Sequence, residues 1–448
     1  MGIKKTRTAG LIATAAVGAL ALAGCSAPAN SNGSTSGAGK TITVYVGANT
    51  QYAQAQQQWF KDVSAAFEKQ TGAKVAFETY ASGNDELTKI QTSVVSNQGP
   101  DIYDLGTTFT PTAYSTGAFV KLTAADWKAI GGKSKFIPST LGISGPDAND
   151  QVGIPFASRP FVMAYNTDLL TKAGISAPAT TWDGLAAQAK KLTGNGVYGM
   201  AVAYKDNYDP WKYIWAMDSQ SGNPLVNGKT ATIDDATTLK AYQTYFGWLT
   251  QDHVVDPASV GWSNNQALAA FASGKAAFFP MTTATSIHTL DSSAVKGKYK
   301  YALMPTVPPG ATSLPSGGKP VASILSGDNL VVAQYSKTQD LDFKLIKLLT
   351  DDAQQKIQYT EFGNLPVNAS TASALESSSP ALKPIVDASA ASYATPFTGA
   401  WGDIELGLVN VVVQSIPKLA GGSVSDSSLK SLLAAAQKTA QSSLNRAK

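Results

Sequence analysis

The sequence predicts an α/β protein folded into two lobes. Between residues 41 and 105 the hydrophobic pattern alternates strand, helix, strand, helix and strand, which is typical of a parallel sheet with crossover helices. After a leader and a tether roughly 410 residues remain, and one hydrophobic core rarely serves more than about 250–300 residues. We therefore expect two lobes, each with its own core.

The alternation rests on five segments. Thr41–Val46 is a run of β-branched and apolar residues, and it predicts a buried strand. Over 52–70 apolar residues recur at helical spacing, and Gly72 ends that pattern. The same reasoning predicts a strand over 74–80, a helix over 85–97 and a strand over 101–105.

The rest of the chain continues this mixture of strands and helices. A Pro- and Gly-rich stretch over 305–318 predicts a loop, and we expect Thr167 or Asp168 to cap the helix after the strand over 162–165. The other predicted strands cover 198–203, 276–279 and the extended segment 321–332. The other predicted helices cover 185–192, 239–249, 265–271, 338–349, 404–416 and 429–443.

Cys25 is the only cysteine in the sequence, and it closes the run Leu22-Ala23-Gly24-Cys25. A basic head and an apolar stretch over 11–23 precede it, which predicts a secretory signal peptide over 1–24. Small residues followed by cysteine resemble the bacterial lipobox, where the cysteine is acylated and becomes the new N-terminus. The alternative is a plain signal peptide that contains a cysteine.

Residues 25–40 are small, polar and glycine-rich, which predicts a flexible tether. Loss of the leader would remove Lys4, Lys5 and Arg7 and lower the net charge from +4 to +1, so we expect no nucleic-acid partner. A single cysteine leaves no disulfide within the chain. No other segment is long and apolar enough to predict a membrane span.

Six short motifs occur in order behind this leader. Together they resemble the extracellular solute-binding proteins of sugar-importing ABC transporters, the group that includes maltose-binding protein. The resemblance runs from Thr41 to the C-terminus. The motifs cover 67–72, 99–102, 153–155 with 165–169, 181–182, 271–277 and 363–367.

The resemblance implies a two-lobed, periplasmic-binding-protein-like fold of the type II class, with an α/β domain in each lobe. It places the ligand between the lobes and implies that hinge closure buries it. It implies hinge crossings near 154–161, 321–327 and 366–379. The first lobe would comprise 41–155 with 328–372, and the second 160–320 with 376–448.

A sugar presents apolar C–H faces and a rim of hydroxyls, so its site needs flat aromatic side chains and fixed polar groups. By resemblance, Trp211 and Trp401 match stacking aromatics, and Trp401 is expected on an exposed loop between glycines. The alternative for both is core packing. Trp262 is a further candidate, balanced between the two roles. Trp59, Trp182 and Trp215 lie on helical patterns and are expected in the core.

Ligands of parallel sheets bind beyond the carboxyl ends of the strands. Asn49 and Gln51 follow the first predicted strand, and Asp104 and Thr107 follow the third, so each could bind a sugar hydroxyl. The alternative is turn chemistry, because Asn and Asp favour loops for backbone reasons.

The resemblance adds four residues to the candidate ligand site. Arg159 lies in the first hinge crossing and could donate several hydrogen bonds to vicinal hydroxyls, with an inter-lobe ion pair as the alternative. Met281 and Thr283 match a ligand loop, although Thr283 stands where maltose-binding protein has tryptophan. Asp328 lies just past the second crossing.

Other chemistries find little support. The two histidines, His253 and His288, lack metal-ligand spacing, and no Gly-rich phosphate loop occurs, so we expect neither a metal nor a cofactor. A surface-anchored glycoside hydrolase is the rival reading, with Asp104 and either Asp403 or Glu405 as its carboxylates about 5–10 Å apart. A third reading is an adhesin or scaffold lipoprotein that binds no small ligand.

The hypothesis is therefore a binding protein rather than an enzyme. We expect a monomeric, lipid-anchored receptor at the extracellular face of a bacterial, Gram-positive cell membrane. It would capture a carbohydrate and deliver it to the permease subunits of an ABC transporter. Several candidate aromatics predict more than one sugar subsite and so favour an oligosaccharide.

Overall fold

The computed structural model describes residues 37–206 and 209–447. Within this part, the chain from residue 36 onwards forms one compact unit. The predicted signal peptide, the lipidation site at Cys25 and most of the tether lie outside the described residues. No helix within the described ranges is long and apolar enough to cross a bilayer.

The first sheet has the strand order β2-β1-β3-β12-β4. β1 runs parallel to β2 and β3, with Thr41 opposite Lys74 and Gly47 opposite Tyr80, as the alternating pattern predicts. β12 runs antiparallel to both β3 and β4, so the complete sheet is mixed rather than parallel. The strands are β1 (Thr41–Gly47), β2 (Lys74–Tyr80), β3 (Ile102–Gly106), β4 (Ile154–Ser158) and β12 (Gly327–Val332).

The longer helices of the first lobe, such as α1 and α11, each bury an apolar stripe. α1 buries Trp59, Val63 and Phe67 and ends at Gly72, which has a φ of +76°. α1 also packs against α11, which joins the start of this lobe to a segment from much later in the chain. The helices here are α1 (Ala53–Thr71), α2 (Gly83–Ser96), α3 (Thr110–Thr116), α4 (Ala124–Ala129), α11 (Gln339–Leu349), α12 (Asp352–Phe362) and α13 (Ala369–Ser378).

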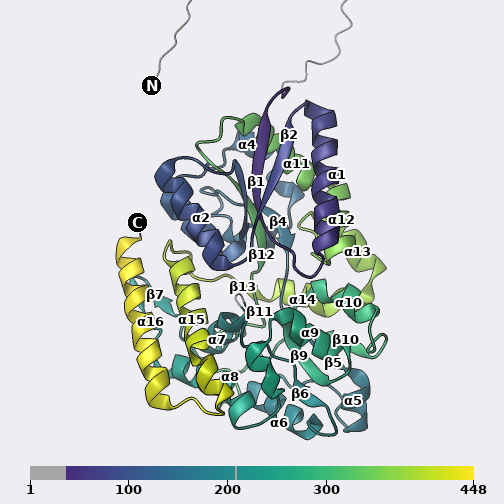
Figure 1. The fold of residues 1–448 in the computed structure, drawn as a ribbon, viewed down its shortest axis with the longest axis vertical. Coiled ribbons are helices and arrows are strands. Elements are labelled where there is room, and N and C mark those ends of the chain that lie inside the picture. The colour runs from purple at the N-terminus through teal and green to yellow at the C-terminus, as the bar shows by residue number, and fades with distance from the viewer. Residues whose placement is uncertain (1–36, 207–208, 448) are drawn as a thin grey trace, which may run out of the picture. The chain divides into compact units, whose positions relative to one another are not determined.

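The second sheet has the strand order β10-β5-β9-β6 and lies below the first sheet in Figure 1. β9 is buried along its whole length and runs antiparallel to β5 but parallel to β6. The strands are β5 (Val162–Asn166), β6 (Tyr198–Met200), β9 (Ala276–Thr282) and β10 (Tyr299–Ala302). Two-stranded pairs form from β7 (Val226–Asn227) with β8 (Thr230–Ala231) and from β11 (Ser323–Ile324) with β13 (Ser392–Tyr393).

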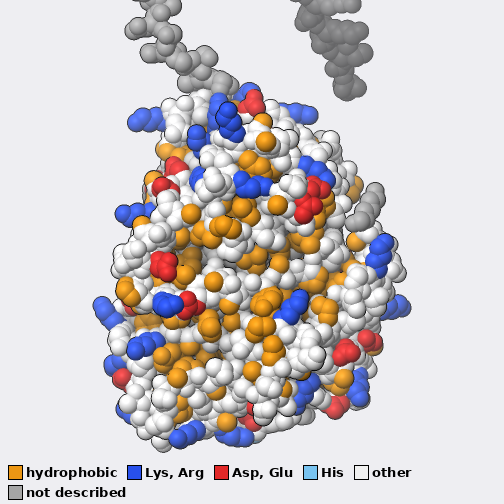
Figure 2. All heavy atoms as spheres, turned by 180° about the vertical axis from the view of Figure 1, so that it is seen from behind, with side chains coloured by type: hydrophobic (Ala, Val, Ile, Leu, Met, Phe, Trp, Pro, Cys, Tyr) orange, Lys and Arg blue, Asp and Glu red, His pale blue; other side chains and the backbone are white. Residues whose placement is uncertain are grey.

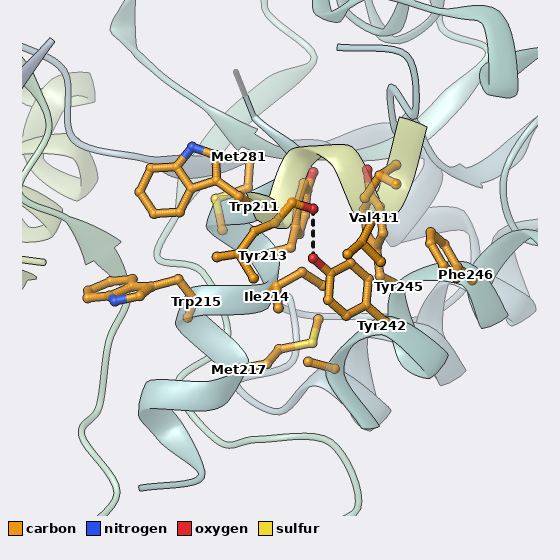
Figure 3. Close-up of a cluster of buried hydrophobic side chains, with 14 of the residues drawn as sticks. Trp211, Tyr213, Ile214, Trp215, Met217, Tyr242, Tyr245, Phe246, Met281 and Val411 are labelled. Atoms are coloured by element: carbon orange, nitrogen blue, oxygen red, sulfur yellow. Dashed lines mark hydrogen bonds between the residues drawn. The ribbon is translucent and has the colours of Figure 1, made fainter. Parts of the chain in front are cut away.

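An aromatic core fills the second lobe between α7, α8 and α15. Trp215 and Tyr213 on α7 are buried, and Figure 3 shows α7 side chains facing Tyr242 and Tyr245 of α8. The helices are α5 (Thr167–Lys172), α6 (Trp182–Leu192), α7 (Pro210–Gln220), α8 (Ala236–Thr250), α9 (Asn264–Ala272), α10 (Ile287–Asp291), α14 (Lys383–Ala390), α15 (Trp401–Ala420) and α16 (Asp426–Arg446).

The chain passes between the two sheets more than once. Residues 159–161 join β4 of the first sheet to β5 of the second, and residues 303–326 lead back from β10 to β12. α12 packs against α13, whereas α14 packs against β5 and β10, so the chain returns to the second lobe beyond α12.

Two local predictions are wrong. Neither Thr167 nor Asp168 caps α5, because Asn166 does so: its Oδ1 accepts hydrogen bonds from the backbone N–H groups of Asp168 and Leu169, both at 3.1 Å. Trp401 does not lie on an exposed loop, since it is the first residue of α15 and is fully buried.

Gly327 is required where β12 meets β4. Its φ is +152°, and a Cβ atom there would lie 1.9 Å from the backbone oxygen of Ala157. Gly407 in α15 differs, because a Cβ atom would meet nothing within 4 Å. We expect Gly327→Ala to lower the free energy of unfolding by more than about 1 kcal/mol, and Gly407→Ala to raise it by about 0.5–1 kcal/mol. Urea unfolding of both variants measures this, and a fully stable Gly327→Ala protein would contradict it.

Candidate functional site

Charged side chains gather where the ends of the two sheets meet. They come from α2, β3, the 159–161 linker, the start of α7, β12 and α15. Each interacts electrostatically with at least one other member; Glu86, Asp104 and Glu405 are buried, and the others are partly buried. We call this set the charged cluster; its members are Glu86, Asp104, Arg159, Asp209, Lys212, Asp328 and Glu405.

Arg159 and Asp328 form a bidentate ion pair. Nη1 and Nη2 of Arg159 each donate to a different carboxylate oxygen of Asp328, and Nη1 also donates to Oδ1 of Asn364 at 3.4 Å. The two pair members are 29% and 13% exposed. The ion pair that the sequence left as the alternative for Arg159 is therefore present, and it joins three separate segments of the chain.

Asp104 is the middle residue of β3, opposite Leu330 of β12, so the prediction that it follows the strand is wrong; it is 8% exposed. Its backbone oxygen accepts a hydrogen bond from the Tyr80 hydroxyl at 2.9 Å, but its side-chain Oδ1 has no partner. Burial and the nearby Asp328 raise the pKa of Asp104 well above its usual range, and Arg159 opposes that shift. A buried acceptor without a donor is costly, so this oxygen is suited to receive a donor from a ligand.

Glu86 and Glu405 approach the same place from α2 and α15, two helices in contact. Oε1 of Glu86 accepts a hydrogen bond from the Gly106 backbone at 3.0 Å, whereas Oε2 of Glu405 has no partner. Burial raises the pKa of Glu405 to about 7, and burial together with repulsion by Glu405 raises the pKa of Glu86.

Lys212 is the second cation of the cluster and is paired with Asp209. Its Nζ lies 2.6 Å from Oδ1 of Asp209, and burial raises the pKa of that carboxyl. The same Nζ lies 4.7 Å from the ring centroid of Phe161 and 5.9 Å from that of Trp211. Both cations of the cluster are therefore already engaged with carboxylates.

Trp211 and Trp401 pack against each other beside this cluster. Their ring centroids are 5.8 Å apart at an interplanar angle of 69°, and the residues are 1% and 0% exposed. Neither indole N–H has a hydrogen-bond partner. Figure 3 shows Met281, which has a φ of +52°, next to Trp211. The two indoles are therefore interior side chains.

The loop after β1 bridges the two lobes. Asn49 makes turn hydrogen bonds, since its Oδ1 accepts from the backbone N–H groups of Gln51 and Tyr52 at 3.1 and 2.8 Å. Gln51 Nε2 donates to the Thr285 carbonyl and to Thr289 Oγ1, both at 3.1 Å. The Tyr52 hydroxyl donates to the same Thr285 carbonyl at 2.5 Å. This loop thus fastens the first sheet to the segment that follows β9.

Of the remaining candidates, Thr107 and Thr283 make hydrogen bonds within the fold, and Trp262 lines a different cavity. Thr107 Oγ1 donates to the Leu325 carbonyl at 3.1 Å, and Thr283 Oγ1 accepts from the Thr285 backbone at 3.3 Å. Trp262 lies in the wall of a second-lobe cavity of about 300 Å³ that Tyr198 also lines, and no member of the charged cluster lines this cavity. The structure therefore groups only some of the predicted residues: Asp104, Arg159, Asp328, Trp211 and Trp401.

Sequence reasoning missed Glu86, Asp209 and Lys212. Charged residues on helices are almost always exposed, so nothing in their local sequence distinguishes them from surface residues. The bridging pair of Tyr52 and Thr285 was also missed, because its members are 233 residues apart in the chain.

The raised pKa of Glu405 predicts that the stability of the protein depends on pH. Its pKa in the folded protein is about 7, above the ordinary value of 4.5, so its stabilising effect is complete below 4.5 and is lost as pH rises through 7. We expect Glu405→Gln to reduce the fall in Tm between about pH 5 and pH 8 without abolishing it, because Glu86 also has a raised pKa. Thermal unfolding across that range measures the difference.

The control for this prediction is Glu376→Gln, which alters an exposed carboxylate on α13. Its curve of Tm against pH should run parallel to that of the unmodified protein. If the curve of Glu405→Gln also runs parallel to that of the unmodified protein, then Glu405 does not have a raised pKa in the folded protein.

Comparisons with known proteins agree with this architecture. The sequence model of a family described as bacterial extracellular solute-binding protein matches residues 62–384. The diacetylchitobiose binding protein DasA of Streptomyces coelicolor is 24% identical over 406 residues, which cover 86% of this chain and 88% of DasA. A maltooligosaccharide ABC transporter solute-binding lipoprotein of Streptococcus pneumoniae is 24% identical over 389 residues, 84% of each chain.

The structure of maltose-bound MalE3 from T. maritima superposes with a TM-score of 0.73. The two chains are 20% identical, and the match covers 89% of this chain and 99% of MalE3. The fold is accordingly the two-lobe α/β architecture that the sequence analysis expected, with mixed sheets.

Proposed function

The chain belongs to the bacterial extracellular solute-binding protein family, and from this premise we propose that it is the receptor of an ABC importer that binds a carbohydrate between its lobes. The observation that carries the proposal is the pairing of Trp211 and Trp401 beside the charged cluster, at the junction of the two sheets. Indole faces suit sugar C–H faces, and buried carboxylate oxygens without donors suit hydroxyls.

The ligand-facing residues of this proposal are interior in the closed arrangement and become accessible when the lobes separate. Ligand binding then shifts the balance towards closure by its extra contacts in the closed form. The hydrogen bonds of Gln51 and Tyr52 to Thr285 stabilise the same closed form. The proposed contacts at the junction are Asp104, Arg159, Trp211, Met281, Asp328, Trp401 and Glu405, with Asn49, Gln51, Thr107 and Thr283 at its border.

An oligosaccharide is the proposed ligand class. Both relatives described above carry names that specify a saccharide of more than one unit, diacetylchitobiose in one case and maltooligosaccharide in the other. Two adjoining indoles provide apolar surface for more than one sugar ring. Trp262, in its separate cavity, has no part in this site as proposed.

The proposal includes attachment through a lipid on Cys25 after removal of residues 1–24, with 25–40 as the tether. The relative from Streptococcus pneumoniae is named a lipoprotein, which supports this reading. In this proposal the first lobe comprises residues 41–155 and 328–372, and the second lobe comprises residues 160–320 and 376–448. On the face in Figure 2, basic and acidic side chains are interspersed, which suits a small-molecule receptor that docks as a monomer on permease subunits.

A thermal-shift screen of the chain from residue 36 onwards tests this function. Mono- and oligosaccharides of glucose, mannose, xylose and N-acetylglucosamine serve as probes. A true ligand at 100 times its Kd should add about 2.7 kcal/mol to the free energy of unfolding and so raise Tm. Chromatography of the recovered saccharide gives the control, because a glycoside hydrolase would shorten it. No stabilisation by any sugar would favour the scaffold reading, and sustained cleavage would favour the hydrolase.

A further inference from the structure

Building on the proposed function, we infer that the carbohydrate bound at the charged cluster carries a protonated amine. The site then selects amino sugars with a free ammonium group over neutral sugars of the same length.

The first observation is an excess of carboxylates over cations. Arg159 is engaged by Asp328 and Lys212 by Asp209, each through an ion pair. Glu86, Asp104 and Glu405 form no ion pair with any residue in the described ranges 37–206 and 209–447. The cluster therefore contains three buried carboxyl groups for which the chain supplies no cation of their own.

The second observation concerns atoms rather than net charge. Oδ1 of Asp104 has no hydrogen-bond partner, although this residue is only 8% exposed. Oε2 of Glu405 also lacks a partner at normal hydrogen-bond distance, although Thr108 and Trp401 adjoin that carboxyl. Buried polar atoms are nearly always satisfied, so a donor from outside the chain is the simplest completion of the site. An ammonium group provides three donors and one positive charge, whereas a hydroxyl provides one donor and no charge.

Electrostatics decides between these two donors. Glu86 and Glu405 repel each other, and Asp104 is repelled by Asp328. A neutral sugar can donate hydroxyl hydrogen bonds to these carboxyl groups, but it brings no positive charge to offset their mutual repulsion. A cation allows them to ionise, because an opposite charge at hydrogen-bond distance favours the charged form of each acid. The free energy of binding therefore gains an ionic contribution that a neutral ligand cannot provide.

The aromatic side chains fit the same ligand. The Lys212 ammonium already lies 4.7 Å from the Phe161 centroid and 5.9 Å from the Trp211 centroid, so these rings accept a cation at close range. Trp401 stacks edge-on against Trp211, and it also lies close enough to Glu405 to lower the pKa of that carboxyl. Carboxylates and indole faces together form the kind of surface that binds a sugar-linked ammonium.

The test compares one saccharide with and without its positive charges. Calorimetry measures the Kd of β-1,4-linked glucosamine trisaccharide and of its fully N-acetylated counterpart at a pH where titration of the free trisaccharide shows its amines to be protonated. We expect the charged trisaccharide to bind at least tenfold tighter. Equal affinity, tighter binding of the N-acetylated form, or binding of neutral glucose oligomers alone would overturn the inference and leave the proposed function standing.

Variants locate the cause of the preference. Asp104→Asn and Glu405→Gln preserve side-chain size and should each reduce the affinity ratio at least threefold. Asp218→Asn is the matched control, because Asp218 is a fully buried acid on α7 outside the cluster. The ratio of the two trisaccharide affinities should stay unchanged in the Asp218→Asn variant. An unaltered ratio in both cluster variants would overturn the assignment to these carboxylates. If no saccharide of any charge bound the unmodified protein, the proposed function itself would fail.

Discussion

The junction of the two lobes depends on the ion pair between Arg159 and Asp328. One guanidinium group holds the linker between β4 and β5, the start of β12 and the segment beyond α12 through Asn364. It is also the cation nearest Asp104, whose buried side chain would otherwise face Asp328 without compensation. Removal of one member of such a pair typically costs about 3–5 kcal/mol, since the other charge stays buried and unpaired. The same pair thus holds these three segments together and contributes both of its charges to the candidate site.

The sequence predicts those parts of the fold whose information is local. Thr41–Val46 and the helix that contains Trp59 were identified because periodicity and end signals agree over a few residues. The antiparallel entry of β12 was not predicted, since it pairs with β3 from more than two hundred residues away. The bounds of α7 could not be predicted, although Trp215 lies on a helical pattern, because the helix is buried on nearly every side (Figure 3) and so lacks the polar stripe of an amphipathic helix.

The candidate site, like the fold, could be predicted only where the information is local in the sequence. Asp104, Arg159 and Asp328 were each identified as candidates, but the partnership of Arg159 with Asp328 spans 169 residues and leaves no local trace. Trp211 and Trp401 were selected for flat surfaces exposed to a ligand, whereas the folded chain buries them against each other. Glu86 and Lys212 show the limit most clearly, because their importance arises only from the lobe-to-lobe packing that takes helical charges out of solvent.

The central claim is that the ligand occupies the junction of the lobes, and a crystal structure with the most stabilising saccharide tests it most directly. The account predicts sugar atoms within hydrogen-bond distance of Asp104 and Glu405 and against the rings of Trp211 and Trp401. Sugar density in the cavity lined by Tyr198 and Trp262, with an unoccupied junction, would contradict it.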